Sequence, residues 1–314
     1  MKIGIGAAIA CCLVACSTPH TASLVEPIVG GTDDSHDTAI VASLAHSPSS
    51  PANDAIICTA SVVSPHVVLT AAHCVAPAAV GQGAQYKIFL GDNSFDPQQM
   101  VTKNYANVMQ VVVHPQFAPA TSKSAYDVAV LISSTALTTP LLSLNHTDLA
   151  TLPAHALVRI VGFGITSAGD TTSEGTRREA LTTLGSFDSN TLTISDAVHE
   201  ACDGDSGSPA LITIGGREVI AGVLTTGDAS CAQALYNRVD TVIAPFVEPL
   251  IAQHDPSVDL GTPEDASSPA LDLGSGMLPG SGGCEIATGG GTPVHALLLA
   301  LAVLFVGRKR RTAG

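Results

Sequence analysis

Three short segments carry side chains that could together turn a serine hydroxyl into a nucleophile. His73 closes Thr70-Ala71-Ala72-His73 after an apolar run, Asp127 opens another apolar run, and Ser206 lies in Gly204-Asp205-Ser206-Gly207. A serine hydroxyl attacks poorly until a base takes its proton, and histidine suits that task because it titrates close to neutrality. A carboxylate fixes the tautomer of the imidazole and stabilises its protonated form. We therefore predict Ser206 as a nucleophile, His73 as its general base and Asp127 as the residue that orients His73.

The elements that must position these side chains are predicted to be strands. Between residues 28 and 254 the apolar runs are short, and Gly, Pro, Asn, Asp and Ser fill the gaps between them. This spacing predicts an all-β barrel or sandwich. Helical periodicity is confined mainly to Thr241–His254, where Pro245 and Pro249 limit it to a short terminal helix.

The cysteines fall into two groups by their position in the chain. Four of the eight cysteines lie near the termini, and four lie in the middle: Cys58, Cys74, Cys202 and Cys231. An even number in an exported domain predicts two disulfides, with three possible pairings. A zinc site is the alternative, but the spacings match no zinc-binding pattern.

The N-terminus has the pattern of an export signal. Lys2 precedes an apolar run from Ile3 to Ala15, so residues 1–16 are predicted to be a signal peptide. Leu13-Val14-Ala15-Cys16 also resembles a bacterial lipobox, in which the cysteine is lipidated; an ordinary signal peptide is the alternative. Residues 17–27 would then be a short pro-segment.

The C-terminus has the pattern of a linker and an anchor. Residues 255–283 are rich in Pro, Ser, Gly and Asp and are predicted to be a flexible linker. In residues 284–314, Cys284 precedes an apolar stretch and the basic cluster Arg308–Arg311. Counted from Ile286 to Gly307, the stretch reaches the roughly 20 residues that a membrane helix needs, and the basic cluster would stay cytoplasmic. We therefore expect residues 28–254 to lie outside the cytoplasm. The tail resembles myxobacterial C-terminal sorting signals, with a plain membrane anchor as the alternative.

The formal net charge of −14 argues against a nucleic-acid partner, because phosphate binding needs clustered Lys and Arg. No cofactor is predicted.

The order of the three segments, together with further motifs, resembles the trypsin/chymotrypsin family, in which His, Asp and Ser follow one another along the chain. The resemblance covers residues 28 to about 254. The motifs that extend it are Ile28-Val29-Gly30-Gly31, Cys58-Thr59-Ala60-Ser61, His114-Pro115-Gln116-Phe117, Gly162-Phe163-Gly164, Gly222–Gly227, Cys231 and Tyr236-Asn237-Arg238-Val239. The resemblance implies two six-stranded antiparallel β-barrels with the active site between them and a short C-terminal helix. It also implies the disulfides Cys58–Cys74 and Cys202–Cys231, and an oxyanion hole formed by the N–H groups of Gly204 and Ser206.

The resemblance further implies activation by cleavage before Ile28. The freed α-ammonium would pair with Asp205 and shape the oxyanion hole, so the triad is expected to be latent until then. Pro27 precedes Ile28, which argues against activation by cleavage after Lys or Arg and leaves the activating protease unidentified. Asp92 and Asp96 lie near the position of a calcium loop in some family members, but acidic surface turns are commoner and no metal is predicted.

The substrate pocket departs from the family pattern. The resemblance assigns Glu200, Thr225 and Gly227 to the pocket, with Glu200 at its floor. A carboxylate there predicts cleavage after Lys or Arg; the alternative is that Glu200 turns aside toward solvent. The stretch from Cys231 to Tyr236 is shorter than in trypsin, Thr226 replaces an aromatic residue and Ser208 replaces a glycine.

The leading interpretation is a surface-tethered serine endopeptidase that acts on proteins or peptides. The main alternative is a catalytically silent binding protein on the same fold, although no triad residue is missing. An esterase of the α/β-hydrolase type is disfavoured, because its Ser-before-His order and its Gly-x-Ser-x-Gly turn are both absent.

Overall fold

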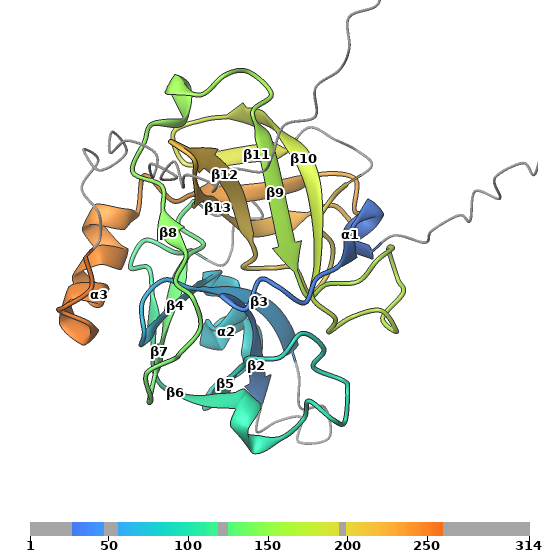
Figure 1. The fold of residues 1–314 in the computed structure, drawn as a ribbon, viewed down its shortest axis with the longest axis vertical. Coiled ribbons are helices and arrows are strands. Elements are labelled where there is room, and N and C mark those ends of the chain that lie inside the picture. The colour runs from blue at the N-terminus through green and yellow to red at the C-terminus, as the bar shows by residue number, and fades with distance from the viewer. Residues whose placement is uncertain (1–26, 47–55, 119–124, 195–198, 260–314) are drawn as a thin grey trace, which may run out of the picture. The chain divides into compact units, whose positions relative to one another are not determined.

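Two antiparallel β-barrels form the part of the chain that the structure describes (Figure 1). The structure, a computed structural model, describes residues 27–46, 56–118, 125–194 and 199–259. The predicted signal peptide, nearly all of the pro-segment and linker, and the C-terminal tail lie outside these residues. Each barrel is closed and has six strands, so the predicted fold class is confirmed.

The first barrel follows the strand order β2-β3-β4-β7-β6-β5. Its strands are β2 (Ile40–His46), β3 (Ile56–Val62), β4 (Val67–Thr70), β5 (Gln85–Phe89), β6 (Tyr105–Val113) and β7 (Ala129–Ser133). Every residue of β4 and β7 is buried, which explains why these two segments are almost continuously apolar in the sequence. Their antiparallel pairing sets Thr70 opposite Ala129, so the residues just beyond these two strand ends are brought close together.

The second barrel follows the order β9-β10-β11-β14-β13-β12 and closes through the pairing of β12 with β9. Its strands are β9 (Leu157–Gly162), β10 (Arg178–Phe187), β11 (Thr191–Ile194), β12 (Pro209–Ile214), β13 (Arg217–Gly227) and β14 (Ala234–Arg238). Two short strands add to its edges: β1 (Thr32–Asp33) pairs with β10, and β8 (Ser143–Leu144) runs parallel to β13.

Helices are few among the described residues, and the predicted terminal helix is present. They are α1 (Pro27–Gly30), α2 (Pro77–Val80) and α3 (Glu248–His254), with short turns η1 (Ala72–Cys74), η2 (Thr102–Asn104), η3 (Leu149–Thr151) and η4 (Ile243–Val247). At the end of α3, Asp255 lies 2.6 Å from Nδ1 of His66. In the described ranges no helix has the length and apolar character needed to cross a membrane.

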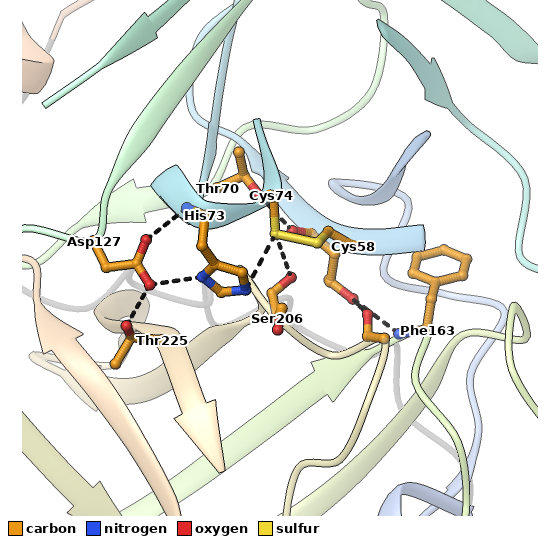
Figure 2. The surroundings of a disulfide bond; sticks show 10 residues. Cys58, Thr70, His73, Cys74, Asp127, Phe163, Ser206 and Thr225 are labelled. Carbon is orange, nitrogen blue, oxygen red and sulfur yellow. Dashed lines mark hydrogen bonds and ion pairs between the residues drawn. A yellow bond between two sulfur atoms is a disulfide. The ribbon is translucent and has the colours of Figure 1, made fainter. Parts of the chain in front are cut away.

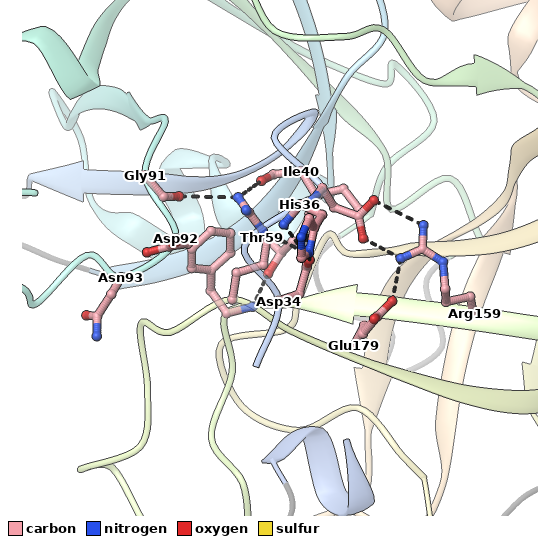
Figure 3. Close-up of polar contacts among 12 residues, drawn as sticks. Asp34, His36, Ile40, Thr59, Gly91, Asp92, Asn93, Arg159 and Glu179 are labelled. Carbon is pink, nitrogen blue, oxygen red and sulfur yellow. Dashed lines mark hydrogen bonds and ion pairs between the residues drawn. The ribbon is translucent and has the colours of Figure 1, made fainter. Parts of the chain in front are cut away.

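A buried ion pair ties the N-terminal segment to both barrels. Arg177, which directly precedes β10, is 1% exposed, and its Nε donates to Oδ2 of Asp34 at 2.9 Å. Its Nη1 donates to the carbonyl oxygens of Ile40 (3.0 Å) and Gly91 (3.3 Å) in the first barrel (Figure 3). Burial by itself would raise the pKa of Asp34, but the His36 N–H and the Arg177 guanidinium bring this pKa below its usual value.

A second cation on this side of the molecule is more exposed. Arg159 on β9 bonds to the carboxylate of Glu179 (Figure 3). It also bonds to the carboxylates of Asp37 and Glu218. These partners are between about a fifth and two fifths exposed. Because exposed ion pairs are screened by solvent, we expect this cluster to stabilise the fold less than the buried pair does.

Replacing Arg177 by methionine should lower the free energy of unfolding by about 3–5 kcal/mol, because the substitution strands the buried Asp34 carboxylate. Arg217→Met is the matched control, since Arg217 is exposed. Urea denaturation of both variants measures the difference, and an equal loss in the two would contradict the assigned role of the ion pair.

Candidate active site

The three side chains predicted to act together converge between the barrels. His73 lies in η1 directly after β4, Asp127 lies two residues before β7, and Ser206 lies in the loop that leads into β12. Figure 2 shows the imidazole of His73 between Asp127 and Ser206. The Thr59 N–H on β3 donates to the Ser206 carbonyl oxygen at 2.8 Å, which fastens the serine loop to the first barrel.

Asp127 holds His73 in one orientation. Asp127 is 2% exposed; its Oδ1 accepts from the His73 backbone N–H at 2.8 Å, and its Oδ2 lies 2.6 Å from His73 Nδ1. Because a carboxylate accepts at Nδ1, the imidazole proton resides there and the Nε2 lone pair is left for another partner. The His73 side chain is one-third exposed.

Thr225, predicted as a pocket residue, contacts Asp127. Its hydroxyl donates to Oδ2 of Asp127, so the buried carboxylate accepts three hydrogen bonds in all (Figure 2). Thr225 belongs to β13 of the second barrel, whereas Asp127 precedes a strand of the first. The hydrogen bond therefore spans the junction between the barrels.

The loop around Ser206 depends on two glycines in a left-handed conformation. Gly204 has φ +91° and Gly207 has φ +84°, and a Cβ on Gly207 would lie 2.4 Å from the Thr59 carbonyl oxygen. Within the described part of the chain, the N–H groups of Gly204 and Ser206 donate to no protein acceptor. Two unbonded N–H groups beside a serine hydroxyl can stabilise an oxyanion that forms there.

Asp205 is buried beneath this loop. It is 0% exposed; its Oδ1 accepts from the Gly164 N–H at 2.7 Å and its Oδ2 from the Cys202 N–H at 2.9 Å. Burial raises the pKa of Asp205 to about 7 despite these bonds. A Cβ on Gly162 would lie 2.1 Å from Oδ1 of Asp205, so the Gly-Phe-Gly turn must be free of side chains where Asp205 enters it.

Ile28, the predicted partner of Asp205 after cleavage, is buried in the core of the second barrel. The chain runs unbroken from Pro27 into Ile28, so Ile28 carries a peptide nitrogen here and not an ammonium. Its φ of +39° is strained for a β-branched residue.

Glu200 does not turn toward solvent. It is 1% exposed, and its backbone N–H donates to the Val29 carbonyl oxygen at 3.3 Å. Burial raises the pKa of Tyr236 on β14, and the charges of Asp205 and Glu200 raise it further, so acidic groups gather on this side of the second barrel. Gly227 ends β13, and a Cβ there would lie 3.2 Å from the Gln233 carbonyl oxygen.

The two disulfides join the pairs that the resemblance implied. Cys58–Cys74 links β3 to the turn that carries His73, and Cys202–Cys231 links the Ser206 loop to the segment between β13 and β14.

Sequence reasoning missed two residues that support the Ser206 loop. Thr59 accepts from the Phe163 N–H at 3.0 Å and donates to the Gly204 carbonyl oxygen at 3.2 Å, so it joins the Gly-Phe-Gly turn to this loop. Arg178 donates to the Gly164 carbonyl oxygen at 3.3 Å. The Thr59 contacts join residues far apart in the sequence, whereas the Arg178 contact crosses the segment between β9 and β10. The only local signal was a pair of adjacent arginines in an acidic chain.

Two further features lie on or beside the first barrel. An amide hydrogen of Gln99 donates to Oδ1 of Asp92 at 2.6 Å, so this amide already bonds to a carboxylate of the acidic loop. An open groove of about 1290 Å³ lies on the first barrel, bordered by β5 and β6, and includes Phe95, Met100 and Met109. None of His73, Asp127 and Ser206 lines the groove.

Comparison with known proteins places this geometry in a family. The family model described as Trypsin matches residues 28–248. Chymotrypsin-like elastase family member 1 of Macaca fascicularis is 25% identical over 186 residues, covering 53% of this chain and 66% of that protein. Urokinase-type plasminogen activator of Gallus gallus is 28% identical over 217 residues, covering 59% of this chain and 49% of that protein. The chain therefore spans just under two thirds of the first of these relatives and about half of the second. Because the family match covers both barrels and more than half of the chain, the chain belongs to the trypsin family.

Proposed function

We propose that this chain is an exported serine endopeptidase with Ser206 as nucleophile, His73 as general base and Asp127 as the group that orients His73. The observation that carries the proposal is the Asp127 carboxylate 2.6 Å from His73 Nδ1, with the imidazole lying between Asp127 and Ser206 (Figure 2). Membership of the trypsin family supports peptide-bond hydrolysis.

In this mechanism the Ser206 hydroxyl gives its proton to His73 Nε2 as its oxygen attacks the substrate carbonyl carbon. The Asp127 carboxylate stabilises the imidazolium that forms. The carbonyl oxygen becomes an oxyanion and accepts from the N–H groups of Gly204 and Ser206, each worth roughly 3–4 kcal/mol. His73 then protonates the leaving amine. Water hydrolyses the resulting ester of Ser206 by the same proton transfers in reverse.

The buried Glu200 supports a preference for Lys or Arg at the cleaved bond. A carboxylate that is 1% exposed is poorly solvated, so a cationic substrate side chain that reaches it would form a strong charge-assisted hydrogen bond. The short segment between Cys231 and Tyr236 leaves part of the pocket wall to be supplied by other residues.

Cleavage before Ile28 would add a cation to the site. The freed α-ammonium would pair with the buried Asp205 carboxylate and stabilise the loop that carries Gly204 and Ser206. The activating protease must accept Pro27 before the cleaved bond.

The two disulfides support an oxidising compartment outside the cytoplasm. Attachment through residues 284–314 is part of the same proposal, and absence of the chain from membrane fractions of its host would refute it.

A fluorophosphonate should label Ser206, and the form that begins at Ile28 should react faster than the full chain. Ser206→Ala is the control and should not react. Mass spectrometry of the labelled peptide identifies the modified residue. If neither form is labelled, the proposed enzyme is refuted and a binding protein on the same fold is favoured.

Replacing Thr225 by valine should lower kcat about 10- to 100-fold, because a buried carboxylate that loses a hydrogen bond is destabilised by about 1–3 kcal/mol. Thr225→Ser keeps the hydroxyl and should retain most of the activity. Steady-state kinetics on one peptide substrate measure both variants. Equal activity of the valine and serine variants would show that the hydroxyl does not support Asp127.

Replacing Glu200 by glutamine should remove the preference for basic substrates. We expect the ratio of kcat/KM between a Lys substrate and a Leu substrate to fall by about 10- to 100-fold, because the charge pairing is lost. Glu218→Gln removes the same charge from β13 and should leave the ratio unchanged. A Glu200→Gln variant that still prefers Lys would exclude Glu200 as the specificity residue.

A further inference from the structure

The buried Asp205 carboxylate requires a positive partner, and the uncleaved chain offers no α-ammonium at Ile28. Two backbone N–H groups satisfy its oxygens, but they carry no net charge. An ionised carboxylate without a counter-charge is costly to bury. Asp205 lies between Gly204 and Ser206. Burying its charge without a partner therefore destabilises the same loop that carries the two unbonded N–H groups.

Arg178 is positioned to meet this requirement. It is the first residue of β10, and its side chain is 9% exposed. Its Nη1 donates to the carbonyl oxygens of Gly164 (3.3 Å), Ser173 (2.5 Å) and Thr176 (3.4 Å), and so holds both ends of the segment between β9 and β10. Its Nε donates to Asp33, whose side chain is 73% exposed, so water screens that ion pair.

Gly164 connects Arg178 to the Ser206 loop. The Gly164 carbonyl oxygen accepts from Arg178, while the Gly164 N–H donates to Oδ1 of Asp205. The next residue, Ile165, donates its N–H to the Asp203 carbonyl oxygen at 2.8 Å. A Cβ on Gly204 would lie 2.9 Å from the Gly164 Cα, so the two backbones are in direct contact.

Charged and titratable groups near Asp205 lie on its own loop and the residues before it, on β10 and on β14. Asp203 lies on its own loop, Glu200 just before that loop, Tyr236 on β14 and Arg178 on β10. Burial, together with the charge of Asp203, raises the pKa of Asp205 to about 7, even though the guanidinium of Arg178 acts to lower it. Arg178 is thus the cation that favours an ionised Asp205 in the uncleaved chain.

We propose that Arg178 is a positioning residue that supplies the counter-charge of Asp205 before Ile28 is released, so that the uncleaved chain already has an ordered oxyanion hole and a basal activity. The inference rests on the proposed function and departs from the full latency that the family resemblance implies. Release of Ile28 then raises an existing activity by adding a second cation.

The test compares the full chain and the form beginning at Ile28, each as wild type, Arg178→Gln and Arg178→Lys, with N-terminal sequencing to verify each form. In the full chain, Arg178→Gln should lower kcat at least about tenfold with little change in KM, because the oxyanion hole acts on the transition state. In the form beginning at Ile28 the loss should be less than about threefold, because the α-ammonium replaces the missing charge.

The pH profile separates a charge effect from a structural one. Losing Arg178 raises the pKa of Asp205 further, so the acid limb of kcat/KM in the full chain should move to higher pH. Arg178→Lys keeps the charge and should keep the limb near its wild-type position. Arg217→Gln removes an exposed cation elsewhere on the second barrel and should change neither kcat nor the limb.

The outcomes distinguish this inference from the proposed function. Equal losses in both forms with no shift of the acid limb would mean that Arg178 only stabilises the fold. Fluorophosphonate labelling of wild type in the Ile28 form alone would overturn the basal activity and leave the proposed enzyme intact. Labelling of neither form would overturn both. The wild-type labelling comparison decides the inference even if Arg178→Gln does not fold.

Discussion

A buried carboxylate is costly unless its oxygens accept hydrogen bonds, and three buried carboxylates lie where the two barrels and the N-terminal segment meet. Asp34, Asp127 and Asp205 are each at most 5% exposed. Asp127 draws a partner from the opposite barrel, since Thr225 donates to it from the second barrel. Asp34 pairs with Arg177 beside β10, and Arg177 in turn donates to carbonyl oxygens of the first barrel. Because such bonds are directional, they fix the position of one barrel against the other more closely than apolar contact does.

This constraint also explains the glycines around the candidate active site. Asp205 enters the Gly-Phe-Gly turn so closely that a side chain on Gly162 or Gly164 would overlap its carboxyl group. Gly207 has no room for a side chain because the serine loop lies directly on Thr59 and Thr70. The same close approach that satisfies Asp205 therefore holds Ser206 near His73, and the glycines are needed for both.

Much of the fold and the composition of the site could be predicted from the sequence, because their signals are local or ordered along the chain. The short apolar runs predicted the strands, and the order of His73, Asp127 and Ser206 within recognisable motifs predicted which residues meet. The hydrogen bond from Thr225 to Asp127 and the contacts of Arg177 and Arg178 leave no such signal. The contacts of Thr225 and Arg177 join residues far apart in the chain, and that of Arg178 crosses the segment between β9 and β10. Each depends on side-chain directions that only the closed barrels define. The burial of Glu200 likewise depends on how the loop before Ser206 packs against the second barrel.

The loop that carries Gly204 and Ser206 is surrounded by more negative charge than the proposed oxyanion hole favours. The cations near this loop therefore matter, because they offset that charge. Glu174 lies against Gly204, where a Cβ would be 3.2 Å from its Oε1, and Asp203 and Asp205 flank the same glycine. A negative field at this place opposes an oxyanion. Burial and the charge of Asp203 raise the pKa of Glu174, which shifts this side chain toward its neutral form. Arg178, bonded to the carbonyl oxygen of the neighbouring Ser173, offsets part of the remaining charge. The proposed reactivity of Ser206 therefore depends on the balance between these acids and the cations near them as well as on the arrangement of His73 and Asp127.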